Sequence, residues 1–152
     1  MPKASVKRLI ECNKKDLISL VLDIEKYPEF VPFCFDAKVH ENKNDGDLTK
    51  IIADLTIGKG PFKDTYKSDV LYNKKEDSIF VKNIDGPLNH LSNNWTFSDK
   101  QNGITEITFD IDFEIKNKFL NSLMIVSFQF GLEKIADAFQ KRAEELFGKT
   151  KD

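Results

Sequence analysis

Apolar and polar residues alternate along the middle of this chain, and this alternation is its clearest pattern. The most regular run covers residues 107–115, where Ile and Phe occupy the odd positions and Thr, Asp and Glu the even ones. A period of two is typical of a strand with one buried and one solvated face, and so of an antiparallel sheet covered on one side. Similar runs occur within residues 36–115, separated by turn-forming segments at 44–46, 58–61, 73–75 and 101–103.

The chain before this region predicts a first strand and a short helix. Residues 4–12 alternate, and Asn13 then supplies an oxygen that can cap a helix, with Asp16 three residues later. The apolar residues that follow at helical spacing are Leu17, Leu20, Val21 and Ile24. We expect Pro28 to end this helix and to hold Tyr27 in an extended conformation.

A long helix is predicted from Lys118 to Phe147, between a candidate cap at Asn117 and a candidate stop at Gly148. It would extend about 45 Å, which is enough to cross a whole sheet. One-sided strands must bury their apolar face against another element, and this helix is the longest that the sequence offers. The expected fold class is therefore α+β, in one domain over residues 1–152, with a curved antiparallel sheet of about seven strands wrapped round the C-terminal helix.

The two halves of this helix differ in hydrophobicity. The C-terminal half is amphipathic, whereas residues 119–130 are apolar almost all round. A helix on a sheet needs one apolar stripe, so the surplus needs a second partner. Four partners fit: a covering loop, a long apolar ligand, a membrane surface or a second copy of the chain. The covering loop that we expect is an aromatic segment, residues 27–35, which we call the aromatic hinge.

Composition and charge narrow the class of protein. The chain has 152 residues, of which 40% are hydrophobic and 32% charged, a balance typical of a globular domain. Its net charge of −2 gives no global basic field, so we expect no DNA partner. The 13 Phe residues indicate either an aromatic core or a cavity lined by rings.

Few residues suggest chemistry. The two cysteines, Cys12 and Cys34, are too few for a metal cluster, and we expect free thiols in a reducing, cytoplasmic compartment. The first residues do not resemble a signal peptide, and no apolar run is long enough to span a membrane. The carboxylates of run 107–115 lie on its polar face, away from a cavity, which makes them poor acid–base candidates. We therefore expect no enzyme activity and no metal.

Three segments resemble one family. Residues 27–34 read Tyr-Pro-Glu-Phe-Val-Pro-Phe-Cys, residues 86–91 read Gly-Pro-Leu-Asn-His-Leu before Trp95 and Phe97, and residues 137–143 read Asp-Ala-Phe-Gln-Lys-Arg-Ala before Gly148. These segments are similar to motifs of the coenzyme Q-binding protein family, which also contains bacterial ribosome-association toxins. The chain departs from the family pattern at Phe33, where Trp is common, and at Leu88, where Phe is common. The resemblance implies a START-like helix-grip fold.

The resemblance also implies a function. It implies a non-catalytic carrier or chaperone that binds a polyprenyl quinone in its cavity and supports respiratory electron transport. The toxin branch implies the alternative of an inhibitor that binds the large ribosomal subunit and prevents subunit association. A third alternative, from the shared fold, is an enzyme of the polyketide cyclase or aromatase kind. Transient contact with the inner face of a membrane is compatible with the carrier.

The residues that we predict to contact the ligand come from the aromatic hinge, the inward strand positions and the terminal helix. They are Tyr27, Phe30, Phe33, Phe62, Tyr66, His90, Trp95, Phe97, Phe109, Phe113, Met124, Phe128 and Phe139. Packing in the core is the alternative for each ring, and a backbone hydrogen bond at a strand end is the alternative for His90. Arg142 either pairs with a carboxylate of the sheet or faces a ligand head group.

Overall fold

The structure, a computed structural model, describes the backbone of residues 3–59, 61–85 and 88–147. It describes the side chains of these residues except 59, 62, 85, 88, 89, 115 and 120–129. Phe62, Met124 and Phe128 were predicted to contact a ligand, and their side chains lie outside this description.

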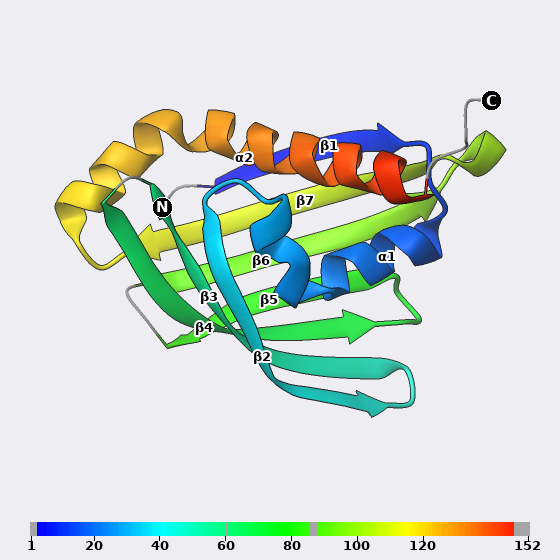
Figure 1. The fold of residues 1–152 in the computed structure, drawn as a ribbon, viewed down its shortest axis with the longest axis horizontal. Helices are drawn as coiled ribbons and strands as arrows, with labels where there is room; N and C mark the ends of the chain where they lie inside the picture. The colour runs from blue at the N-terminus through cyan, green and yellow to red at the C-terminus, as the bar shows by residue number, and fades with distance from the viewer. Residues whose placement is uncertain (1–2, 60, 86–87, 148–152) are drawn as a thin grey trace.

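One antiparallel sheet forms the body of the fold (Figure 1). Its strands are β1 (Lys3–Ile10), β2 (Cys34–Asp45), β3 (Leu48–Lys59), β4 (Phe62–Asn73), β5 (Ser78–Asp85), β6 (Leu88–Asp99) and β7 (Thr105–Ile115). Their order in space is β1-β7-β6-β5-β4-β3-β2, so every neighbour except the β1–β7 pair follows directly in sequence. The helical elements are α1 (Lys14–Leu22), η1 (Ile24–Glu29), η2 (Gln101–Gly103) and α2 (Lys118–Phe147). The predicted α+β helix-grip class is confirmed.

The first helix is shorter than the sequence predicts. Asn13 caps it as expected, because its side-chain oxygen accepts the backbone N–H of Asp16 at 2.9 Å. The helix ends at Leu22, however, and Pro28 lies inside the 3-10 helix η1. The prediction that Pro28 ends the helix and keeps Tyr27 extended is therefore wrong. The chain turns at Asp23, whose N–H reaches the carbonyl oxygens of Ser19 and Leu20.

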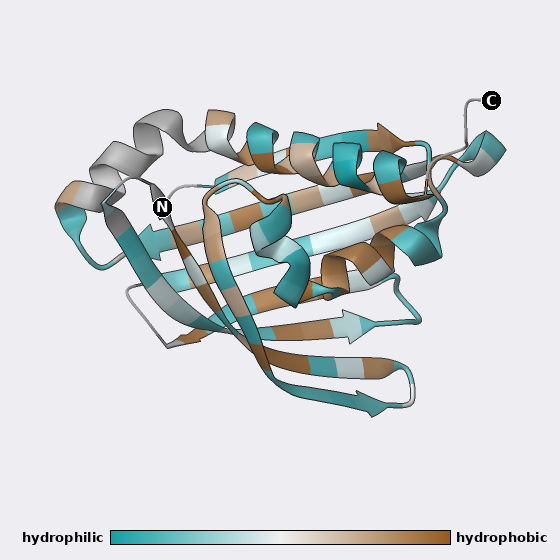
Figure 2. Cartoon of the chain, in the orientation of Figure 1, coloured by the Kyte–Doolittle hydropathy of each residue, from teal (hydrophilic) through white to brown (hydrophobic). Residues whose placement is uncertain are grey.

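The alternation along the strands separates two faces of the sheet, and Figure 2 shows the bands of hydropathy along them. In β7, Ile107, Phe109 and Phe113 are buried on the face toward α2, which we call the concave face. Val6 of β1 and Trp95 of β6 are paired with Phe109, so they share that face. The opposite, convex face carries the polar residues of the same strands. The period of two in the sequence therefore corresponds to a sheet with one buried face, as predicted.

Both helices cover the concave face (Figure 1). Helix α2 lies along β1 and β7 and also neighbours α1. Leu132, Ala136, Phe139 and Ala143 form its buried stripe. At its edge Asp137 accepts a hydrogen bond from Arg8 of β1 at 3.1 Å, which holds the helix in register with the sheet edge.

The aromatic hinge meets α2 near the middle of the helix. Phe33 has a backbone φ of 70°, an unusual conformation for a bulky residue. A Cβ added at Gly131 of α2 would lie 3.7 Å from the Phe33 ring, an ordinary van der Waals distance. The helix therefore has room for one carbon atom at this contact.

We expect Gly131→Ala to increase the free energy of unfolding by about 0.5–1 kcal/mol, because alanine restricts the unfolded chain and favours a helix. Urea denaturation measures this. The control is Gly103→Ala, which has open space around it but a φ of 73°, and it should destabilise by about 1–2 kcal/mol. A loss of stability in Gly131→Ala would mean that Phe33 cannot accommodate the added methyl group.

Candidate ligand-binding site

Five rings fill the space between the sheet and the C-terminal half of α2. Phe139 of α2 lies 5.0 Å from Trp95, 5.1 Å from Phe30 and 5.5 Å from Tyr27, centroid to centroid, in edge-to-face contacts. Trp95 stacks on Phe109 at 4.2 Å. Such ring pairs add to the stabilisation that comes from burying their area. We call these five residues the aromatic cluster.

Trp95, Phe109 and Phe139 of the aromatic cluster are buried core residues, and Tyr27 and Phe30 are partly buried and pack against them. The contact of these five rings with a ligand stays a prediction. Phe97, which stacks against Trp95 at 6.5 Å, belongs to the same packing. The remaining part of the concave face lies on the other side of the aromatic cluster, toward residues 118–131 of α2.

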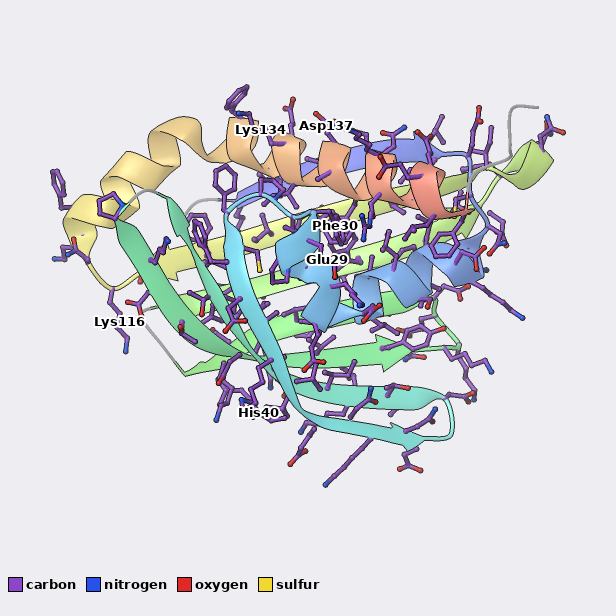
Figure 3. All side chains as sticks on the ribbon, in the orientation of Figure 1. Glu29, Phe30, His40, Lys116, Lys134 and Asp137 are labelled. Carbon is purple, nitrogen blue, oxygen red and sulfur yellow. The ribbon has the colours of Figure 1, made fainter. Side chains whose placement is uncertain are left out.

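Two contacts fix the aromatic hinge against the helices. The hydroxyl group of Tyr27 donates a hydrogen bond to the carbonyl oxygen of Val21, and burial raises the pKa of Tyr27 far above its ordinary value. Arg142 of α2 donates to Glu29 of η1 at 2.8 Å and lies 5.2 Å from the Phe30 ring. Arg142 is thus paired, but its partner is in η1 and not in the sheet as predicted. Figure 3 labels Glu29 and Phe30 beneath α2.

Beyond the aromatic cluster the concave face is covered less completely. Ile111 of β7 and Asn93 of β6 are paired in register and face the helix side, yet both remain half-buried. Ile57 of β3 is also half-buried. The side-chain oxygen of Asn93 is fully buried and has no hydrogen-bond partner among the described residues. This part of the concave face, with Asn93, Ile111 and Ile57, is the candidate site.

Asn93 was missed in the sequence. A signal did exist, because Asn93 lies between Leu91 and Trp95 in the alternation of β6, where an inward residue is expected to be apolar. An inward asparagine is expensive unless its amide finds a partner, so it indicates either a polar contact or a ligand.

The other predicted residues are distributed around this region. Tyr66 of β4 and Phe113 of β7 are buried on the concave face, and burial raises the pKa of Tyr66 well above its ordinary value. His90 lies on the convex face, since it is paired with Glu114 while its neighbour Leu91 is buried. Its Nε2 is 3.6 Å from the carboxylate of Asp112. A ligand on the concave face would not meet His90, so the prediction for His90 is wrong.

Several large apolar side chains are exposed at one end of the sheet. The strand register brings together the start of β2 and the ends of β3, β5 and β7, where the chain enters α2. Phe35, Ile84 and Phe119 are exposed there, Phe119 by 69%. We call this the Phe119 end. Lys63 lies 4.0 Å from the Phe35 ring, and Figure 3 shows Lys116 projecting from the same end.

The described residues offer little else for chemistry. Two shallow surface hollows lie at other places, one between α1 and the β2–β3 hairpin and one beside Leu9 and Gln140, and neither borders Asn93. The described residues include no group of three or more side chains of the metal-binding kinds. Within the same part of the chain, no helix combines the length and the hydrophobicity that crossing a membrane requires.

Comparison with known proteins identifies the family. A family model described as polyketide cyclase / dehydrase and lipid transport matches residues 15–140. The chain belongs to this family. A ribosome association toxin, RatA, of Rickettsia prowazekii (strain Madrid E) is 30% identical over 142 residues, which cover 91% of this chain and 94% of the toxin.

Two further proteins are similar to most of the chain. The mitochondrial coenzyme Q-binding protein COQ10 of Dictyostelium discoideum is 33% identical over 134 residues, which cover 87% of this chain and 64% of that protein's length. A START superfamily structure from Mycobacterium smegmatis has a TM-score of 0.81 at 21% identity, with 95% of this chain and 98% of that chain covered. The resemblance seen in the sequence motifs is confirmed.

We expect the Arg142–Glu29 pair to couple the aromatic hinge to α2 by about 0.5–1 kcal/mol, because both side chains are partly exposed. A double-mutant cycle with Arg142→Met and Glu29→Gln, followed by urea denaturation, measures this coupling. The control cycle uses Lys26→Met with Glu29→Gln, since the more exposed Lys26–Glu29 pair at 3.6 Å should show almost no coupling. Equal coupling in both cycles would contradict the special role of Arg142.

Two buried thiols should make the fold sensitive to alkali. Burial raises the pKa of Cys34 and of Cys12 from 9.0 to about 11. Between these values the unfolded thiols ionise and the folded ones do not, so the free energy of unfolding should fall as pH rises from 9 to 11. Urea denaturation across this range measures the slope. The Cys34→Ala and Cys12→Ala variants should each show a shallower slope, and a slope unaffected by both would contradict this assignment.

Proposed function

We propose that this protein is a non-catalytic carrier or chaperone for a hydrophobic ligand, a polyprenyl quinone, and that it supports respiratory electron transport. The observation that carries the proposal is the uneven cover of the concave face. Trp95, Phe109 and Ile107 at and behind the aromatic cluster are buried, whereas Asn93, Ile111 and Ile57 are half-buried although they face inward. Leu91 and Phe113, farther along the same face, are buried. A lipid-like molecule would complete this cover.

The chemistry of the candidate site suits such a ligand. Sites for lipophilic molecules are mostly apolar, with a few polar groups that set the orientation. Here Ile111, Ile57 and Phe113 supply apolar surface, and Asn93 supplies one polar group. Leu91 and Phe113, the next inward residues toward the Phe119 end, continue this apolar surface, along which a tail could extend.

The charges of the site argue against catalysis. The carboxylates of Asp110, Asp112 and Glu114 are on the convex face, as is His90. On the concave side, burial raises the pKa of Tyr27, Tyr66 and Cys34. A raised pKa keeps a hydroxyl or thiol protonated at neutral pH, so these groups are poorly suited to act as general bases.

The comparisons support the proposal at the level of ligand class. The family model is described in terms of lipid transport, and the COQ10 relative is named for binding coenzyme Q. The carrier therefore agrees with both the family and the packing.

Large-subunit binding is a second candidate, favoured by the RatA relative, which the chain matches over 94% of its length. Ribosome binding requires basic surface. The basic residues near the start of the chain, Arg8 and Lys14, are partly neutralised, because Lys14 pairs with Asp77 and Asp99, and Arg8 pairs with Asp137. The net charge of −2 also disfavours an RNA partner. We therefore place this candidate second.

Organic extraction of the purified, natively expressed protein, followed by mass spectrometry, tests the proposal. We expect about one polyprenyl quinone per protein chain. Ile111→Trp, which adds bulk beside Asn93, should lower this loading severalfold. The matched control is Asp110→Trp, one residue away on the convex face, where loading should not change. Thermal unfolding of both variants confirms that they are folded.

An empty extract would contradict the carrier if incubation with quinone-loaded liposomes also left the protein empty. Co-sedimentation with large ribosomal subunits at low salt would then test the second candidate. Equal quinone loading in Ile111→Trp and Asp110→Trp would mean that a quinone binds somewhere other than the candidate site.

A further inference from the structure

Asn93 is a polar residue in an apolar row. Its register partners are Val81 on β5 and Ile111 on β7, and the next inward residues on its own strand are Leu91 and Trp95. Val81, Leu91 and Trp95 are buried, and Ile111 packs against the core. An aliphatic residue would fill the core at this position better than an asparagine does.

The side-chain amide of Asn93 has an unmet need for a partner. Its Oδ1 is fully buried and accepts no hydrogen bond among the described residues. Buried polar atoms in folded proteins are almost always paired with protein, ordered water or a bound molecule. Asn83, the inward amide on the adjacent strand, differs because its Oδ1 accepts the backbone N–H of Leu91 at 2.9 Å. Of these two inward amides, Asn93 is therefore the one whose buried oxygen lacks a partner; Asp112 Oδ1 and Arg142 Nε are also buried without one, but both belong to charged groups, and Asp112 is on the convex face.

We infer that Asn93 hydrogen-bonds the oxygen-bearing head group of the ligand, and that it holds the oxidised and the reduced head group alike. This inference rests on the proposed function and names its polar contact. A primary amide carries a donor and an acceptor, and rotation about its last side-chain bond exchanges the two. The NH₂ group then donates to a quinone carbonyl oxygen, and the oxygen accepts from a quinol hydroxyl group.

The neighbouring packing fixes the direction of the ligand. Trp95 and Phe109 stack at 4.2 Å immediately beyond Asn93, so the head group cannot pass further along the concave face. In the other direction the concave face continues past Leu91 and Phe113 toward the Phe119 end. The head group therefore lies against Asn93 and the Trp95–Phe109 stack, with the tail directed along Leu91 and Phe113.

Three probes separate the polar contact from general hydrophobic binding. Decylubiquinone and decylubiquinol share a tail and differ in redox state, and decylbenzene has the same tail without oxygen atoms. Trp95 is the only tryptophan of the chain and lies next to Asn93 on the concave face, so the quinone should quench its fluorescence. Competition against this quenching gives dissociation constants for the other two probes.

We expect Asn93→Leu to raise the dissociation constants of decylubiquinone and decylubiquinol by about tenfold each, which corresponds to the loss of one hydrogen bond. Decylbenzene binding should be unchanged. The thermal unfolding midpoint should stay the same or rise, because the variant removes an unpaired polar group. Asn93→Ala, which introduces a smaller side chain, is a second variant in which we expect the same loss of quinone and quinol affinity. Asn94→Leu makes the same chemical change on the convex face and should alter none of the three affinities.

Three outcomes would overturn the inference. The first is an unchanged quinone affinity in both Asn93 variants, which would mean that water alone satisfies the amide. The second is a loss of decylbenzene affinity as large as the loss of quinone affinity, which would mean that the variants remove apolar contact and not a hydrogen bond. The third is a loss confined to one redox form, which would refute the dual role. Failure of the wild-type protein to bind any probe would instead refute the proposed function.

Discussion

The packing of Phe139 against Trp95, Phe30 and Tyr27 is the interaction on which the rest of the structure depends. It joins three separate parts of the chain, namely α2, the sheet and the aromatic hinge, through ring contacts of 5.0–5.5 Å. Interiors are packed densely, and these five rings are in mutual edge-to-face or stacked contact at this position. The same contact that fastens the helix therefore divides the concave face into a closed half and an incompletely covered half.

The aromatic hinge couples these two halves. Through Arg142 and Glu29 it is tied to the C-terminal part of α2, and its Phe33 ring lies 3.7 Å from where a Cβ at Gly131 would stand, near the middle of the helix. The left-handed backbone of Phe33 is costly for a bulky residue, and such conformations persist when the surrounding structure determines them. Here the carbonyl oxygen of Phe33 accepts the N–H of Gly58 at 2.9 Å, which ties the aromatic hinge to β3.

The proposed carrier follows from this division. Hydrophobic burial alone is non-directional and would retain many apolar molecules. A single amide at the boundary of the closed half would add orientation and selectivity, because a buried polar group penalises a ligand that leaves it unpaired. In the free protein the side-chain oxygen of Asn93 lacks a hydrogen-bond partner, which destabilises the fold. In the complex the ligand would supply that partner, so the same residue would stabilise binding.

The sequence by itself determined the class of fold and most of its elements. The alternation in β7 and the length of α2 required a one-sided sheet and a covering helix, because these periods depend on local geometry. The motif that contains Phe30 and the one that contains Phe139 also indicated the family.

Only the tertiary structure decided which aromatic rings pack against one another and which inward residues remain half-buried. Phe30 and Phe139 are 109 positions apart, so no local pattern could show that they touch. Sequence reasoning placed His90 beside the ligand because of its motif, but the strand pairing turned it to the convex face and left Asn93 facing inward, since neighbouring residues of a strand point to opposite sides.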